Sequence, residues 1–501
     1  MDFPNAPTQP SPTDWRGAAR LAALVALAFY GLFLARNVAA VAAGSDSSGY
    51  LNLARLLAAG RVHAQARTLA GLPPSAAPRF LYTPLGFLPA PDGTDLVPTY
   101  PTGFGLLALA AAPLAGWGHA ADLVIILHSL AGVAATYALG RILGLAWGWA
   151  ALGSAIVAAS PLYLFMSLQA MSDVPSLAWT TLGVLAALLS RRNPSWALAA
   201  GLAAALDVLL RPTNILAFVP MAVALGASRR GWILFLCGGL PGALFYFAHS
   251  MAAYGSVLTT GYGDIAYTFS AGYAPRTLLH YALWLPALFT PAAALALGLP
   301  WLRGGSPPAR LLLGSWILAF GAFYLFYKCT HETWWYLRFL LPAAPAIVVG
   351  GLLVLQSLAG RAIANPLRSV PAFAVALALI VLNSKVLCRN LFVFETVRDE
   401  QRYGSAADWM RGHLPADAVC LALQETGALY YYTDFTFIRW DALTPGNVAG
   451  IEALIRGSGR PLYAVLFPYE VAQANVLGAV MPGHWRQVGA VSDVTIWRRD
   501  F

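Results

Sequence analysis

Charged residues are scarce in this sequence, and their scarcity indicates the broad class of the protein. Asp, Glu, Lys and Arg make up 11% of the 501 residues, whereas hydrophobic residues make up 58%. Soluble domains carry roughly 25% charged residues. Most of this chain must therefore face lipid or other apolar helices, which excludes an ordinary soluble domain.

Lysine and metal-binding cysteine patterns are also nearly absent. Lys328 and Lys385 are the only lysines, so arginine carries most of the net charge of +9. Without a basic run or a heptad, this charge does not indicate a nucleic-acid partner. The cysteines have no metal-ligand spacing; they are Cys237, Cys329, Cys388 and Cys420. A disulfide between Cys329 and Cys388 is one alternative. The favoured interpretation is that both are buried free thiols.

Long apolar runs are abundant, and a membrane-spanning helix needs roughly 20 such residues. Residues 20–42 resemble a signal peptide, but the length of the run and the further runs after it favour a retained first span. The candidate spans are 20–42, 121–140, 147–166, 174–190, 194–210, 212–227, 231–251, 280–300, 311–328, 337–358 and 370–388.

Arginine placement predicts which loops are cytoplasmic, because short cytoplasmic loops accumulate Lys and Arg. We place the N-terminus in the cytoplasm and the segment 103–117 at the outer surface, or dipping into it, rather than across the membrane. With this topology, the cytoplasmic loops contain arginines and no acidic residue. Those loops are 141–146, 191–193, 228–230, 301–310 and 359–369. The result is about eleven spans, each near the required length.

The last part of the chain differs in composition from the rest. It contains twelve acidic residues after position 390 and shows no Gly-rich phosphate loop. Segments typical of strands alternate with helical ones, which predicts a small α/β domain. The expected helices are 405–415 and 448–457, and the expected strands are 418–423, 436–441, 462–467 and 494–501.

We therefore expect an α-helical polytopic membrane protein with a small C-terminal α/β extracytoplasmic domain. Its parts are a cytoplasmic N-terminus at 1–19, a transmembrane domain at 20–389 with a large first outer loop at 44–119, and a periplasmic domain at 390–501. The Lys-poor, Ala-, Arg- and Gly-rich composition suggests the inner membrane of a bacterium.

A lone carboxylate, Asp46, lies just beyond the first span in the stretch "GSDSSGYLNLARLL". Tyr50, Leu53 and Leu57 follow at helical spacing, so we expect a helix along the membrane surface that fixes this acid at the lipid–water boundary. The alternative is that Asp46 merely caps that helix, since it and its serine neighbours are competent N-caps.

Two further acids and an arginine fall at the same expected face. Asp173 lies in "SPLYLFMSLQAMSDVP", where the alternative is an ordinary helix start before Pro175. Asp207 and Arg211 lie four residues apart at the end of a span. They either form an internal ion pair or leave Arg211 to bind an anionic headgroup.

The stretch "YKCTHETWWYLRFLLPAAP" holds the densest polar cluster. Its aromatic residues are typical of an interfacial belt. Arg338, together with Lys328 and Arg211, offers convergent cations that suit a phosphate or pyrophosphate. A metal site at Cys329, His331 and Glu332 is a weaker alternative.

Together these features resemble the GT-C superfamily of membrane glycosyltransferases, especially the branch with protein O-mannosyltransferases and lipid A aminoarabinose transferases. The resemblance extends over nearly all of 15–390 and rests on order and spacing. The matching stretches are "GSDSSGYLNLARLL", "TYPTGFG", "SPLYLFMSLQAMSDVP", "GLAAALDVLLRPTNILAFVP" and "WWYLRFLLPAAP".

The resemblance implies a polyprenyl-phosphate-linked sugar as donor, with Asp46 as the general base on an acceptor hydroxyl and Asp173 as a second acid. Arg211 and Arg338 would bind the donor phosphate, with Lys328 beside them. Acceptor or sugar binding is assigned to Tyr50, Tyr82, Tyr100, His331, Glu332 and Trp335. The acceptor is a lipid, a polysaccharide or a protein.

Two departures from the family pattern bear on cofactors. The acidic neighbour found in "DE" versions of the first motif is replaced by Ser47, and no DxD motif is present. We therefore expect no cofactor and do not expect a required divalent cation.

Alternative functions remain at this point. A secondary transporter would also place carboxylates in a helical bundle, but such proteins tend to show internal repeats. A non-catalytic lipid-binding or assembly protein would tolerate Asp46→Asn. Ligation of a polysaccharide from a pyrophosphate carrier would be a different transfer at a lipid phosphate.

Overall fold

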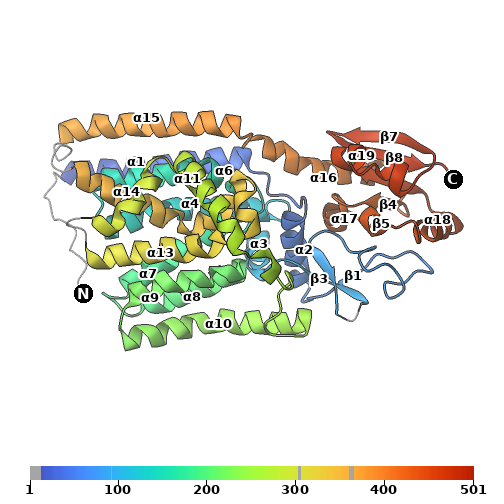
Figure 1. Ribbon diagram of the computed structural model, residues 1–501, viewed down its shortest axis with the longest axis horizontal. Helices are drawn as coiled ribbons and strands as arrows, with labels where there is room; N and C mark the ends of the chain where they lie inside the picture. Colours follow the sequence, from blue (N-terminus) through green and yellow to red (C-terminus); the bar gives the residue numbers. More distant parts are fainter. Residues whose placement is uncertain (1–12, 92, 303–305, 360–365) are drawn as a thin grey trace. The chain divides into compact units, whose positions relative to one another are not determined.

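Figure 1 shows a computed structural model of the protein, which describes residues 13–91, 93–302, 306–359 and 366–501. The chain forms two compact units. The first contains the chain up to Val38, Leu123–Leu244 and Asp264–Phe394, and the second contains Ala39–Asp122, Phe245–Gly263 and Glu395–Phe501.

The first unit is helical. Its α-helices, two of which reach into the second unit, are α1 (Thr13–Asn37), α4 (Ala120–Ile142), α5 (Trp147–Ala159), α6 (Pro161–Ser167), α7 (Asp173–Leu189), α8 (Trp196–Leu210), α9 (Phe218–Leu225), α10 (Arg229–Tyr254), α11 (Ala274–Leu288), α12 (Ala292–Leu295), α13 (Pro307–Leu325), α14 (Ala344–Ala359) and α15 (Pro366–Asn390). Short 3₁₀ helices lie at Pro212–Ala217, Ala266–Thr268, Ala271–Tyr273, Ala296–Trp301, Lys328–His331 and Trp334–Ala343.

Within the described residues, five helices are long and apolar enough to cross a membrane, and a bent pair would make a sixth. The five are Ala120–Ile142, Arg229–Tyr254, Pro307–Leu325, Trp334–Ala359 and Val370–Asn390. They fall on expected spans, which confirms a multi-pass membrane protein. Several other expected spans are apolar helices of fewer than 18 residues, so the total of about eleven stays a prediction.

Prolines break two of the expected spans. The expected helix at 147–166 is bent by 58° between α5 and α6, where Pro161 begins the second helix and the residue before it, Ser160, is extended. The prediction of one helix at 280–300 was wrong: α11 ends at Leu288, and Thr290, just before Pro291, has a φ of 63°. A residue that precedes proline is disfavoured in the α region, so the helix stops there.

The second unit combines helices with two small sheets. Its elements are α2 (Asp46–Ala58), β1 (Ala64–Gln65), β2 (Phe87–Pro89), β3 (Asp95–Pro98), α3 (Thr102–Ala115), α16 (Glu395–His413), β4 (Val419–Ala422), α17 (Thr426–Tyr432), β5 (Thr436–Arg439), a 3₁₀ turn (Trp440–Ala442), α18 (Val448–Gly457), β6 (Leu462–Leu466), α19 (Pro468–Ala472), a π turn (Val476–Val480), β7 (Trp485–Val491) and β8 (Val494–Arg499).

The larger sheet confirms the α/β character expected of the tail. Its strand order is β5-β4-β6-β8-β7. The first three strands are parallel, and β8 pairs antiparallel with both β6 and β7. Strands β4 and β6 are buried at every position, because α16 and α17 cover one face, and α18 together with residues of the first outer loop covers the other. The sequence missed β7, a mostly exposed edge strand.

Helix α2 is largely enclosed by protein, and its expected place along the membrane surface stays a prediction. Its residues Ser47–Ala54 are all buried, because α3 and α17 pack against it. The helix therefore has protein around most of its surface. Helix α3 has 14 residues, which is shorter than the roughly 20 needed for a span.

Candidate functional site

Asp46 is the first residue of α2, and its carboxylate is held by a tyrosine. The Tyr100 hydroxyl donates to Asp46 Oδ1 at 2.6 Å, and its oxygen lies 2.8 Å from Ser45 Oγ. Ser45 occupies the N-cap position of α2 and makes no side-chain cap bond. Burial, and then the Asp46 charge, raise the pKa of Tyr100 well above its ordinary value, so the phenol stays protonated and remains a donor.

A close approach of two glycines makes room for this tyrosine. A Cβ on Gly49 would lie 2.4 Å from Cδ2 of Tyr100 and 3.1 Å from Cα of Gly86. Gly86 itself has a φ of 91°, a conformation that glycine adopts without strain. The glycine of "SSGYLNL" and that of "TPLGF" therefore bring the Tyr100 ring against the start of α2.

Other aromatic residues of the second unit surround Tyr100. Its ring centroid lies 5.2 Å from that of Tyr50 and 6.0 Å from that of Tyr262. Tyr50 is 4% exposed and also contacts Phe104 at 5.2 Å between centroids. Of the tyrosines assigned to acceptor binding, the structure thus brings Tyr50 and Tyr100 together near Asp46.

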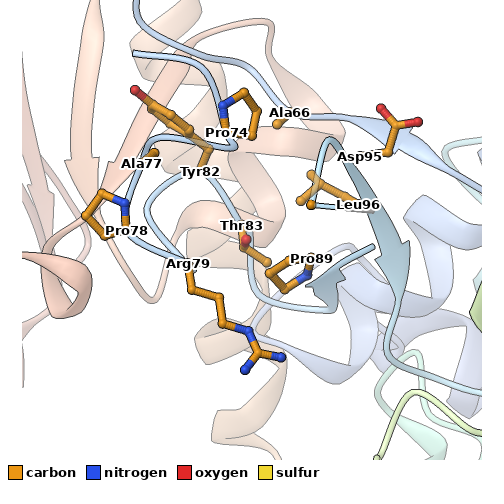
Figure 2. Close-up of a pocket in the computed structure, with 11 residues that line it drawn as sticks. Ala66, Pro74, Ala77, Pro78, Arg79, Tyr82, Thr83, Pro89, Asp95 and Leu96 are labelled. Atoms are coloured by element: carbon orange, nitrogen blue, oxygen red, sulfur yellow. The ribbon is translucent and has the colours of Figure 1, made fainter. Parts of the chain in front are cut away.

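Tyr82, the third of these tyrosines, has a hydroxyl engaged by the backbone. It donates to the carbonyl of Leu72 at 3.2 Å and accepts from the Leu69 amide at 3.4 Å. These bonds favour a role in shaping the outer loop. Tyr82 also lines a small hollow of about 280 Å³, including the open solvent at its mouth, together with Arg79, Thr83 and Asp95 (Figure 2).

The C-terminal part of the second unit fixes α2 from the side of α17. Asn52 Nδ2 donates to the carbonyl of Gly427 at 3.1 Å. Arg55 donates to the Tyr431 carbonyl at 2.7 Å and lies over that tyrosine ring at 3.7 Å. The backbone amide of Ala42 donates to the Tyr432 hydroxyl at 3.0 Å. The position of Asp46 therefore depends on residues almost 400 positions later in the chain.

A second carboxyl group, which the sequence did not single out, lies at the same place. Ser47 Oγ donates to Glu400 Oε2 at 3.3 Å. Burial, and in smaller part the Asp46 charge, raise the pKa of Glu400 to about 7. The "RDEQR" stretch around Glu400 is typical of a solvated helix face, so no local signal indicated this contact.

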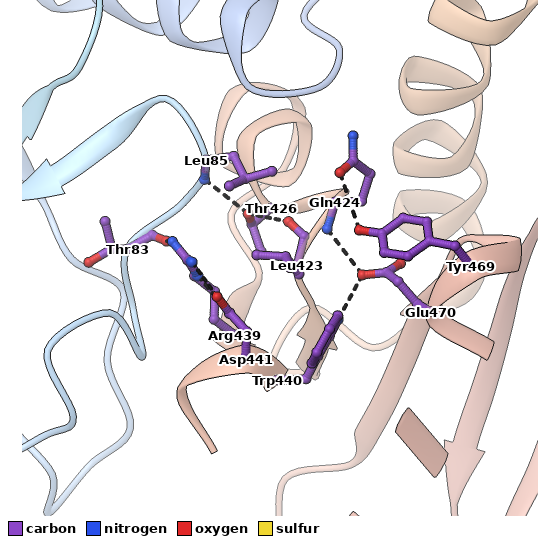
Figure 3. A network of polar contacts seen from close by, with 10 residues as sticks. All are labelled: Thr83, Leu85, Leu423, Gln424, Thr426, Arg439, Trp440, Asp441, Tyr469 and Glu470. Carbon is purple, nitrogen blue, oxygen red and sulfur yellow. Dashed lines mark hydrogen bonds and ion pairs between the residues drawn. The ribbon is translucent and has the colours of Figure 1, made fainter. Parts of the chain in front are cut away.

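Two more acids, Glu425 and Glu470, follow the carboxyl ends of the parallel strands β4 and β6, and Figure 3 shows the contacts of Glu470. Glu470 accepts from Trp440 Nε1 at 2.7 Å and from the amides of Gln424 at 3.2 Å and Phe467 at 2.7 Å. Glu425 is 0% exposed, and neither of its carboxyl oxygens has a hydrogen-bond partner. Burial, and then the Glu470 charge, raise the pKa of Glu425 well above its ordinary value.

In the first unit, Asp173 and Arg211 form a buried ion pair. Arg211 Nη1 lies 2.6 Å from Asp173 Oδ1, and 1% of the surface of Asp173 is exposed. Arg211 ends α8 in an extended conformation, with a φ of −151°, directly before Pro212. This break turns the arginine out of the helix toward α7.

Asp207 belongs to a separate polar cluster. It is 0% exposed, accepts from Asn214 Nδ2 at 2.6 Å and accepts a short bond from the Thr180 hydroxyl. The internal pair of Asp207 and Arg211 considered from the sequence is therefore not needed to satisfy either side chain.

Arg211 and Arg338 converge on one aromatic ring of the first unit. Their guanidinium carbons lie 5.2 and 5.4 Å from the centroid of Phe339. Tyr324 stacks on the same ring at 5.1 Å and donates to Thr213 Oγ1 at 2.7 Å. The structure thus brings together the two arginines that the sequence assigned to phosphate binding.

The remaining assigned residues lie on the segment before Arg338. Lys328 and Glu332 are exposed, and Trp335 is 38% exposed with its ring stacked on Phe165. His331 Nδ1 lies 3.4 Å from Thr277 Oγ1. Throughout the described part of the chain, no group of three His, Cys, Asp or Glu residues could hold a metal ion, and the four cysteines are free.

Solved structures with a similar fold cover nearly the whole chain. ArnT from Cupriavidus metallidurans in the apo state has a TM-score of 0.61 at 15% identity, over 97% of this chain and 98% of ArnT. ArnT bound to undecaprenyl phosphate has a TM-score of 0.59 at 16% identity, over 96% and 98% of the two chains.

Two larger proteins match as well. The arabinofuranosyltransferase AftD from Mycobacteria has a TM-score of 0.55 at 14% identity, over 96% of this chain and 40% of AftD. The oligosaccharyltransferase AglB from Archaeoglobus fulgidus, in complex with an inhibitory peptide and a dolichol-phosphate, has a TM-score of 0.54 at 12% identity. The match covers 92% of this chain and 70% of AglB. No protein-family model and no curated sequence matches the chain. Over nearly its whole length, this chain has the fold of the GT-C membrane glycosyltransferases.

Proposed function

We propose that the protein is a glycosyltransferase that moves a sugar from a polyprenyl-phosphate donor to an acceptor hydroxyl. The observation that carries the proposal is the carboxylate of Asp46, oriented by a protonated Tyr100 at 2.6 Å, in a chain with the GT-C fold. The ArnT structure with undecaprenyl phosphate supports the donor class.

In the proposed reaction, the acceptor oxygen attacks the anomeric carbon while the bond from that carbon to the phosphate oxygen breaks. The acceptor proton passes to Asp46, and the polyprenyl phosphate leaves with the electron pair. General base catalysis of this kind contributes typically about 10²–10⁴-fold. The single displacement inverts the configuration at the anomeric carbon.

Arg211 and Arg338 are proposed to bind the leaving phosphate. Fixed guanidinium groups match phosphate oxygens in bidentate geometry, and charge-assisted bonds are stronger than neutral ones. Asp173 is engaged with Arg211 at 2.6 Å, which favours a role in orienting this arginine. A direct catalytic role of Asp173 stays a prediction, as does the contribution of Lys328.

The acceptor residues are proposed as follows. Tyr100 orients the base, and Tyr50 supports the Tyr100 ring. Trp335, with 38% of its surface exposed, is suited to stack on a sugar, with Glu332 and His331 nearby in sequence. The C-terminal part positions Asp46 through α17, and we propose that it lies on the outer side, together with the first outer loop, 44–119.

The test is donor turnover by the purified protein in lipid nanodiscs. A panel of undecaprenyl-phosphate sugars is supplied with lipid, polysaccharide and protein acceptor fractions, and mass spectrometry measures the undecaprenyl phosphate released. We expect Asp46→Asn to lower turnover at least about 100-fold, whereas Asp417→Asn, at an exposed acid, leaves it unchanged. Equal turnover by Asp46→Asn and the wild type would contradict the assignment of the base.

A further inference from the structure

Asp207 is a buried acid on the apolar helix α8, and the proposed function gives it no role. It lies four residues before Arg211, and its whole side chain is enclosed by protein. A carboxyl group within a membrane helix is costly, and such groups are paired with other residues or serve a function. The contacts of Asp207 indicate what this acid does.

The Asp207 carboxylate joins the two sides of the break in the chain at Arg211. Asn214 Nδ2 donates to Asp207 Oδ1 at 2.6 Å and, at 3.4 Å, to the Asp207 carbonyl. Asn214 is buried and belongs to the 3₁₀ helix Pro212–Ala217, which follows the break. The side-chain bond therefore spans Arg211 and ties this 3₁₀ helix back to the last turn of α8.

The backbone of Arg211 is bound to the same two residues. Its amide donates to the Asp207 carbonyl at 3.0 Å, and its carbonyl accepts from the Asn214 amide at 2.8 Å. Arg211 is extended between them, with a φ of −151°, a conformation that the following proline favours. Because no regular helix continues through Arg211, the bonds between Asp207 and Asn214 fix the direction in which the arginine leaves α8.

A second bond of Asp207 connects α8 to α7. The Thr180 hydroxyl on α7 donates to Asp207 Oδ2. Thr180 lies seven residues after Asp173, the partner of Arg211, and residues at this spacing share one face of a helix. The same face of α7 therefore contacts α8 at Asp207 and, about two turns away, at Arg211.

We propose that Asp207 is a positioning residue that holds Arg211 in the orientation in which it binds the donor phosphate. The proposal rests on the proposed function, because Arg211 is assigned there to the leaving phosphate. Asp207 itself does not touch the phosphate. Its loss releases the chain on both sides of Arg211, and a guanidinium group that is no longer pre-oriented must be ordered when the phosphate binds, which lowers affinity.

The first experiment separates positioning from stability. Native mass spectrometry measures binding of undecaprenyl phosphate, with uncharged undecaprenol as the reference. Asp207→Leu/Asn214→Leu removes both partners of the bond, and replacing both partners of a buried bond by apolar groups costs little stability. We expect this variant to bind undecaprenyl phosphate about tenfold more weakly than the wild type, with undecaprenol binding unchanged. Equal binding of undecaprenyl phosphate by the folded variant and the wild type would overturn the proposal.

Exchanging the two residues provides a rescue. In Asp207→Asn/Asn214→Asp, the amide at position 207 donates to the carboxylate at 214 and its oxygen accepts from Thr180, so the bonds form again with the first one reversed. We expect this variant to bind undecaprenyl phosphate like the wild type, and binding as weak as in the leucine variant would overturn the proposal. Ser129→Ala, which removes a buried bond to Ser167 elsewhere in the first unit, is the matched control and should bind normally.

A second experiment requires no lipid phosphate. Unfolding in detergent measures the stabilities of Asn214→Leu, Arg211→Gln and the combined variant. If Asn214 and Asp207 fix Arg211, the combined loss of stability is smaller than the sum of the separate losses, because coupled residues are not additive. Additive losses would overturn the proposal. If the wild type does not bind undecaprenyl phosphate better than undecaprenol, the proposed function fails, whereas this comparison still decides whether Asp207 positions Arg211.

Discussion

Replacing Gly49 by alanine tests how tightly the start of α2 and Tyr100 are packed. The added Cβ would lie 2.4 and 2.8 Å from Cδ2 and Cε2 of the Tyr100 ring, and 3.1 Å from Cα of Gly86 on the other side. Carbon atoms in contact lie roughly 3.5–4.0 Å apart. The ring must therefore move by about 1 Å, and with it the hydroxyl that orients Asp46.

Overpacking and a weakened hydrogen bond lower the stability of Gly49→Ala, whereas the higher helix propensity of alanine raises it. Overpacking costs about 1–3 kcal/mol, and a weakened hydrogen bond to a charged group costs about 1.5–3 kcal/mol. Alanine favours a helix over glycine by about 0.8–1.0 kcal/mol, which offsets only part of this cost. We expect the free energy of unfolding to fall by about 1.5–5 kcal/mol. We expect kcat to fall up to about 100-fold, because a base misplaced by 1 Å has this effect.

Unfolding in detergent and donor turnover measure the two effects. Gly118→Ala is the matched control, since its Cβ would meet nothing within 4 Å. Tyr100→Phe should lower kcat through the same contact, so the combined variant should lose less than the product of the separate losses. Wild-type stability and turnover in Gly49→Ala, or independent effects of the two changes, would refute this account of the packing.

Two further changes probe buried acids. Asp173→Asn should destabilise the first unit by about 3–5 kcal/mol, because it removes the carboxylate from a buried ion pair. In a denaturation assay, the Asp173→Asn/Arg211→Gln double variant should recover part of this lost stability. Equal stability of Asp173→Asn and the wild type would contradict the ion pair. Glu425→Gln should become more stable relative to the wild type as pH rises. The pKa of Glu425 is raised in the folded protein, so the stability it contributes is full below its unfolded pKa and is lost as pH rises through the folded value. Melting temperatures at pH 5, 7 and 8.5 measure the difference, and a difference that does not change with pH would contradict the assignment.

Much of the fold could be predicted from local sequence. Apolar runs predicted the long helices, and short apolar segments between helical ones predicted β4, β5, β6 and β8. The break at 280–300 was missed although Pro291 signals it, because composition alone was used to delimit the span. Strand β7 was missed for a different reason: as an edge strand, it lacks the buried apolar residues that marked the other strands.

The candidate site could be predicted only where its residues stand out locally. Asp46 is an isolated acid after an apolar run, and Arg211 and Arg338 are isolated cations within apolar segments. Glu400 lies among other charged residues, and its contact with Ser47 spans 353 positions. The partner of Arg211 was likewise set by the packing of α7 against the end of α8, which sequence spacing does not reveal.

The central claim is that the first unit binds a polyprenyl phosphate through Arg211 and Arg338. Native mass spectrometry of the purified protein with undecaprenyl phosphate measures this directly, with uncharged undecaprenol as the reference for binding by the tail alone. Arg486→Ala, at an exposed arginine, is the matched control. Loss of a charge-assisted bond costs about 1.5–3 kcal/mol, so the account predicts that Arg338→Ala binds undecaprenyl phosphate at least about tenfold more weakly than the wild type, with undecaprenol binding unchanged. Equal retention of undecaprenyl phosphate by the wild type and a folded Arg338→Ala would contradict it.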